Sequence, residues 1–155
     1  MKINGIVLVK PKPQVLVIPM GDAKFVLKAK YVENYEGFDK IVPAAVAPEI
    51  LKPKTGERYI DYKDKKYLEQ ESIRSQHRYD WIYLESLSAT EGLEWATVDL
   101  ADPTTWCNWR QDLIDGGMPT TYIARIIDLV NTANGFNTEL LDEATQSFLA
   151  STQEK

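Results

Sequence analysis

The chain has 155 residues, a formal net charge of −5 at pH 7 and a single cysteine. This length suits one domain, or a core with one appended lobe, and allows a sizeable core without disulfides. The net charge argues against a general affinity for nucleic acid. No apolar run reaches the roughly 18 residues of a membrane span, and the start lacks the apolar segment of a signal peptide. We therefore expect a soluble protein of a reducing cytoplasm.

The first 30 residues predict a small antiparallel sheet. Three apolar, largely β-branched stretches follow one another with turn-forming residues between them: 3–9, 15–18 and 25–29. In the third stretch, apolar residues alternate with lysines. This pattern indicates a three-stranded β-meander with one apolar face and lysines on the exposed side.

Charge is distributed unevenly along the chain. Residues 1–30 contain six lysines and one aspartate, whereas residues 91–117 contain six acidic residues and one arginine. Opposite charges at two places favour head-to-tail contact between copies. Two solvated faces on one monomer account for them as well.

The middle of the chain predicts a short helix, a linker and a long helix. Residues 31–41 place apolar side chains at helical spacing, although Gly37 weakens this pattern. Residues 43–58 contain three prolines and predict an extended linker with little packing, the plausible hinge between lobes. Residues 64–89 contain neither glycine nor proline and predict one long helix. Its second half should be buried and its first half exposed.

The segment 92–117 holds three of the four tryptophans, and the rest of the molecule is expected to pack around it. Residues 95–100 indicate an extended or irregular arm. Asp102-Pro103 predicts a helix start, because aspartate caps a first-turn amide and proline suits the first helical position. Gly116-Gly117 predicts the end of this helix.

Two further helices are expected after this segment. Pro119 opens the first, whose apolar residues recur without a gap until Asn134-Gly135 ends it. The second begins with Asn137 or Thr138 as its cap. Its side chains expected to face inward are Leu140, Leu141, Ala144, Phe148 and Leu149.

These elements predict an α+β fold in which a β-meander and a Pro-rich linker precede a mainly helical lobe. The expected organisation has four parts: 1–42, the meander and short helix; 43–58, the linker; 59–150, the helical lobe; and 151–155, a frayed tail.

The sequence indicates no catalytic, cofactor or metal site. His77, the only histidine, lies within the long helix, and Cys107 is expected to be a partly buried small side chain rather than a nucleophile. The acidic residues of the tryptophan-bearing segment lack the spacing of a calcium loop, and a solvated face accounts for them: Asp99, Asp102, Asp112 and Asp115. An interaction protein is therefore favoured over an enzyme.

Residues 86–109, SLSATEGLEWATVDLADPTTWCNW, give the chain a family resemblance. With the opening KINGIVLV, the helix YIARIIDLVNTANG and the ending LLDEATQSFLA, they make the sequence similar to the tail assembly chaperones of long-tailed bacteriophages. The similarity covers nearly the whole chain in the order of its elements. It supplies no residue-level site.

This resemblance implies a non-enzymatic protein of the host cell cytoplasm, without a cofactor, that coats the hydrophobic tape measure protein and keeps it soluble. Tail tube protein then polymerises around the tape measure protein and displaces the chaperone, which is absent from the virion. The resemblance also implies a frameshifted longer form and self-association into a homo-oligomer. No nucleic-acid or membrane partner is expected.

Such a role needs an apolar groove with a charged rim. Five aromatic residues either line this groove or belong to the core: Trp81, Trp95, Trp106, Trp109 and Tyr122. Two other functions stay open. One is a structural virion component, such as a tail-completion or head-tail joining protein, and the other is a small enzyme with an acidic metal site at Asp99 or Asp102.

Overall fold

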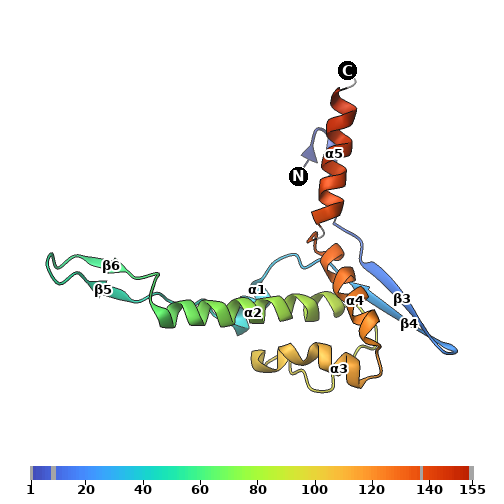
Figure 1. Cartoon of the computed structure of the whole chain (residues 1–155), viewed down its shortest axis with the longest axis horizontal. Coiled ribbons are helices and arrows are strands. Elements are labelled where there is room, and N and C mark those ends of the chain that lie inside the picture. The colour runs from blue at the N-terminus through green and yellow to red at the C-terminus, as the bar shows by residue number, and fades with distance from the viewer. Residues whose placement is uncertain (1, 8–9, 137, 154–155) are drawn as a thin grey trace. The chain divides into compact units, whose positions relative to one another are not determined.

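The computed structural model describes residues 2–7, 10–136 and 138–153, and Figure 1 shows their helices and strands. The predicted α+β class is confirmed. The chain divides into two compact units, each built from segments far apart in sequence. The first comprises Met1–Val32, Glu85–Glu94 and Leu113–Lys155, and the second comprises Glu33–Leu84 and Trp95–Asp112.

Four short strands open the first unit. They are β1 (Lys2–Ile3), β2 (Ile6–Val7), β3 (Gln14–Met20) and β4 (Ala23–Ala29). β1 pairs with β2 and β3 with β4, each pair antiparallel. The expected three-stranded meander is therefore wrong within the described residues, which form separate hairpins. The first predicted strand turns back at Asn4-Gly5, where φ values of 50° and 82° make a tight turn, and its residues 8–9 lie outside the described residues.

The core of the first unit lies between the β3–β4 hairpin and helix α4 (Thr120–Ala133), which packs on both strands. The buried side chains come from alternate strand positions and from one helix face: Ile18, Leu27, Ala29, Ile123, Ile126, Val130 and Ala133. Helix α4 confirms the apolar periodicity of this segment. Helix α4 covers only one face of the hairpin, because Ile18 and Leu27 are buried while Val15 and Val17 are exposed.

Asn134, at the end of α4, joins three segments of this unit. Its side-chain amide donates to the Ser86 hydroxyl at 2.7 Å and to the Val130 carbonyl at 2.8 Å, and its carbonyl accepts from the Val32 amide at 2.9 Å. Ser86 is fully buried and donates in turn to the Lys30 carbonyl at 2.7 Å. A buried hydroxyl without such partners would cost about 1–3 kcal/mol.

Helix α5 (Thr138–Gln153) closes the chain. Its described side chains are all exposed: Glu139, Leu141, Asp142, Glu143, Ala144, Thr145, Gln146, Ser147 and Leu149. The expected inward face is therefore wrong for Leu141, Ala144 and Leu149, while the Leu140 and Phe148 side chains lie outside the described residues. The helix also includes residues 151–153 of the expected frayed tail, of which Glu154 and Lys155 lie outside the description.

The second unit contains a short helix and residues 65–84 of the long helix, whose last three residues belong to the first unit. The short helix α1 (Glu36–Ile41) lies within the segment predicted to be helical. The long helix α2 (Lys65–Leu87) matches its predicted range closely, because no glycine or proline interrupts it. Its burial also follows the prediction, since buried residues begin at Asp80 and most residues before that position are exposed.

The segment expected to be an extended linker contains a hairpin. Strands β5 (Glu49–Leu51) and β6 (Arg58–Ile60) pair antiparallel around a turn in which Gly56 has a φ of 67°. The Lys52 amide donates to the Glu57 carbonyl at 2.9 Å and supports this turn. All six strand residues are exposed. Pro48 precedes this hairpin and Pro53 lies in its turn, so residues 49–60 form a paired hairpin rather than an unpaired linker.

The tryptophan-bearing segment contains two consecutive helices instead of one. A 3-10 helix, η1 (Pro103–Asn108), begins at Asp102, which accepts a bond from the Thr104 amide, and helix α3 (Trp109–Asp115) follows. The preceding arm is irregular, as predicted. The Asp112 carboxylate holds it by accepting the Ala96 and Thr97 amides at 2.9 Å each.

Candidate functional site

Trp81, Trp106 and Trp109 are core residues of the second unit. Trp106 and Trp109 are 0% exposed, and Trp81 is 9% exposed. Phe38, on α1, contacts two of these rings, with centroid distances of 6.0 Å to Trp81 and 6.3 Å to Trp106. Trp109 stacks on Tyr83 at 4.8 Å with an interplanar angle of 14°. This burial favours the core alternative for these tryptophans.

Trp95 and Tyr122 differ from these three because both are only half-buried. Trp95 lies in the irregular arm of the second unit, and Tyr122 lies on α4 in the first unit. The five aromatic residues named by the sequence therefore do not share one environment.

A buried carboxylate lies beside the stacked tryptophan. Asp80 is 4% exposed and accepts the Trp109 indole N–H at 3.2 Å and the Gln76 side-chain amide at 3.3 Å. These bonds satisfy both carboxylate oxygens, which burial would otherwise penalise heavily. Sequence reasoning assigned Asp80 no role, although an aspartate within the apolar half of a helix is a signal of such a network.

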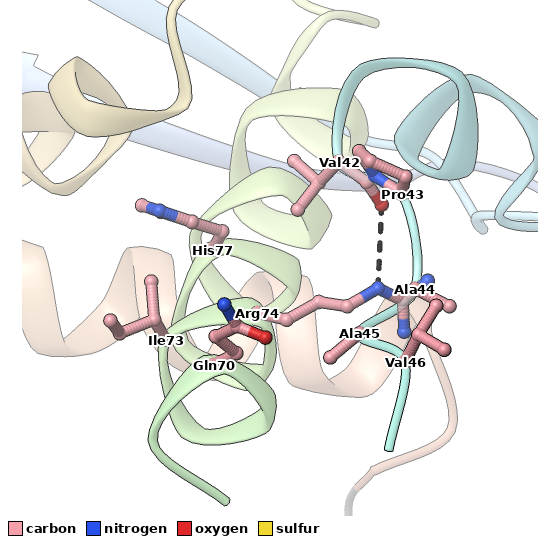
Figure 2. A pocket seen from close by; sticks show the side chains of 9 residues that line it. All are labelled: Val42, Pro43, Ala44, Ala45, Val46, Gln70, Ile73, Arg74 and His77. Carbon is pink, nitrogen blue, oxygen red and sulfur yellow. Dashed lines mark hydrogen bonds between the residues drawn. The ribbon is translucent and has the colours of Figure 1, made fainter. Parts of the chain in front are cut away.

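A cleft of about 440 Å³ lies between residues 42–46 and helix α2, within the second unit. Figure 2 shows its lining on both sides of the space. The lining is largely apolar: Val42, Pro43, Ala44, Ala45, Val46, Gln70, Ile73, Arg74 and His77. Val46 is 84% exposed and Ile73 is 51% exposed, so the cleft carries apolar surface that the described chain leaves in contact with water.

Two polar contacts hold the extended side of this cleft against α2. The Arg74 guanidinium donates to the Val42 carbonyl at 3.3 Å (Figure 2) and also pairs with Asp39. The Ala45 amide donates to the Glu71 carboxylate at 3.3 Å. Sequence reasoning missed the cleft because the prolines of this segment suggested a linker without packing.

A second, more polar pocket of about 400 Å³ lies between α2 and the tryptophan-bearing helices. Its lining is Gln76, Tyr79, Asp80, Cys107 and Arg110. Cys107 is exposed, which contradicts the expectation of partial burial, because successive residues of a helix face different directions and Trp106 takes the buried one. The Arg110 guanidinium lies over the Trp109 ring, 5.0 Å from its centroid.

The acidic residues of this segment serve as local hydrogen-bond acceptors. The Thr104 hydroxyl and amide lower the pKa of Asp102. Burial raises the pKa of Asp112, but its bonds from the Thr97 hydroxyl and neighbouring amides outweigh this and lower the pKa overall. Asp99 accepts the Ala101 amide at 2.9 Å. Among the described residues, no group of three His, Cys, Asp or Glu side chains is placed to hold a metal ion.

Within the described part of the chain, no helix combines the length and apolar character needed to cross a membrane. Comparison of the chain with protein-family models, with curated protein sequences and with solved structures finds no match.

Proposed function

We propose that this protein is a tail assembly chaperone of a long-tailed bacteriophage. In this role it binds the tape measure protein in the host cytoplasm, keeps it soluble, and leaves when tail tube protein polymerises around it. The chaperone acts as a homo-oligomer, without enzymatic activity or cofactor, together with a frameshifted longer form of itself. The resemblance of residues 86–109 and of the flanking segments supports this proposal.

The observation that carries the proposal is the apolar cleft beside α2. The five buried or half-buried aromatic residues offer little surface to a client, whereas Val46 and Ile73 are exposed at the cleft. Its volume, about 440 Å³, lies within the range of about 300–1,000 Å³ typical of binding pockets. Apolar side chains from one face of a client helix would fill it, with the Arg74 and His77 side chains at its polar positions.

Co-expression with the tape measure protein encoded in the same genome tests this proposal. The soluble fraction would be separated by size-exclusion chromatography with light scattering. We expect the client to become soluble and to co-elute with many copies of the chaperone. Insoluble client, together with this chain in purified virions, would contradict the proposal and favour a structural virion component.

Two substitutions test the cleft itself. Ile73→Glu and Val46→Glu place a charge in the lining at exposed positions, so both variants should fold and lose client binding by at least about tenfold. Leu100→Glu is the matched control, because Leu100 is 57% exposed and lies outside the cleft lining. Equal binding by all three variants would remove the cleft from the proposal.

A further inference from the structure

The outer edge of β3 is open along two residues. The amide and carbonyl of Lys28, on β4, both bond to the Thr90 hydroxyl, at 2.8 and 3.0 Å, so they point away from β3. Along a β-strand, the N–H and C=O groups of successive residues point alternately to the two sides. In an antiparallel pair, these groups of two directly opposite residues either both point toward the partner strand or both point outward. Val15 lies opposite Lys28 and Val17 opposite Val26. The N–H and C=O groups of Val15 and Val17 therefore point outward from β3.

The two outer edges of the hairpin differ. The β4 edge is covered where Lys28 bonds to Thr90 and where the Lys30 amide donates to the Ser86 carbonyl at 2.9 Å. The structure shows no such cover for the β3 edge among the described residues. A strand edge that carries neither charge nor cover is a site for pairing with another strand. β3 (Gln14–Met20) contains no charged residue.

Side chains add to the open backbone. Val15 is 56% exposed and Val17 is 51% exposed, on the hairpin face opposite α4. Pro13 and Pro19 occupy the next outward positions on each side and have no N–H to donate. The usable edge is therefore short and bounded, with two donors and two acceptors from Val15 and Val17.

We propose that this edge pairs with the β3 edge of a second copy, antiparallel and about a two-fold axis at Leu16. In this register Val15 lies opposite Val17 of the other copy, so all four outward groups of each strand are bonded. The two prolines then face one another and displace no hydrogen bond. The result is a four-stranded sheet.

The internal symmetry and the neutrality of β3 support a second copy as the partner. β3 contains no charged residue, and its two outward-facing valines meet the same two valines of the other copy on either side of the axis. The uncharged strand creates no repulsion when it meets itself. This side-by-side pairing differs from the head-to-tail contact that the charge distribution suggested, and it specifies the self-association included in the proposed function.

Analytical ultracentrifugation of the full chain alone, from about 5 to 500 µM, tests the proposal without the client. We expect a concentration-dependent dimer. Val17→Pro removes an outward N–H that the hairpin does not use, and should raise the dimer dissociation constant at least tenfold. Val26→Pro is the matched control, because it makes the same change at the opposite position on the β4 edge, and it should change the constant less than twofold.

Circular dichroism and thermal melting of both proline variants would confirm that the hairpin still folds. A monomeric wild type over the whole range, or equal effects of the two prolines, would overturn the proposal. Val15→Pro should weaken the dimer as much as Val17→Pro, because the two-fold register bonds both outward N–H groups; an unchanged dissociation constant for Val15→Pro would overturn the register. If the wild-type chain forms the dimer but does not bind the client, that result would contradict the proposed function and would not contradict the strand pairing.

Discussion

Helices α4 and α5 have similar apolar patterns and different environments. In α4, Ile123, Ile126 and Val130 are buried against the hairpin. In α5, every described side chain is exposed, including Leu141 at 57%. Periodicity therefore indicates which face of a helix is apolar, but another element must be present to cover that face. The two helices provide an internal comparison for the following predictions.

The largest expected difference is between Ile126→Ala in α4 and Leu141→Ala in α5. Ile126 is fully buried, so its truncation should leave a cavity and lower the free energy of unfolding by about 2–5 kcal/mol. Leu141→Ala should change it by less than about 0.5 kcal/mol. Chemical denaturation of both variants checks this. Equal losses would show that α5 contributes to a core.

The side-chain network at the end of α4 should have the next largest effect. Asn134→Ala removes one of the two partners of the buried Ser86 hydroxyl and the acceptor of the Val32 amide, and should lower stability by about 1–3 kcal/mol. Gln146→Ala, an exposed amide side chain on α5, is the control and should have little effect. Thermal melting would distinguish the two, and a neutral Asn134→Ala would refute the role assigned to the network.

Amide hydrogen exchange should separate the two helices without mutation. The amides of α4 belong to a packed element and should exchange only through large-scale unfolding, whereas those of α5 should exchange through local fraying. We expect protection factors that differ by at least about 100-fold. Similar protection of the α4 and α5 amides in the purified protein would mean that another surface, such as a second copy of the chain, covers α5.

The smallest effect is expected from deleting residues 138–155. Because the described side chains of α5 are exposed, the shortened chain should melt within about 2 °C of the full chain. Differential scanning calorimetry measures this directly. A melting temperature lower by about 10 °C or more would place α5 in the core. If the full chain aggregates and the shortened chain does not, α5 takes part in a contact between molecules.

Local signals predicted the helices of this protein well. The lack of glycine and proline between Asp64 and Ala89 located α2, and the Asp102-Pro103 pair located the start of η1. The hairpin at Asn4-Gly5 had a local signal too, since this dipeptide favours a tight two-residue turn. The β5–β6 hairpin was missed because prolines near a strand suggest a break, while its turn depends on Gly56.

The candidate site could not be predicted in the same way. The cleft joins residues 42–46 to α2 through Arg74 and Glu71, contacts that no spacing in the sequence encodes. The tryptophans were correctly identified as prominent, but their burial depends on Phe38 and Tyr83, from elsewhere in the second unit. Whether a tryptophan side chain is exposed or buried therefore depends on contacts between segments that are distant in the sequence.

The bond between Asn134 and Val32 also constrains when the protein can fold. It joins residues 102 positions apart, so closing it requires a large loop and disfavours rapid folding. During synthesis, the β3–β4 hairpin emerges from the ribosome long before α4, and its apolar face has no cover until that helix follows. The N-terminal strands are therefore most vulnerable to aggregation while translation is still in progress.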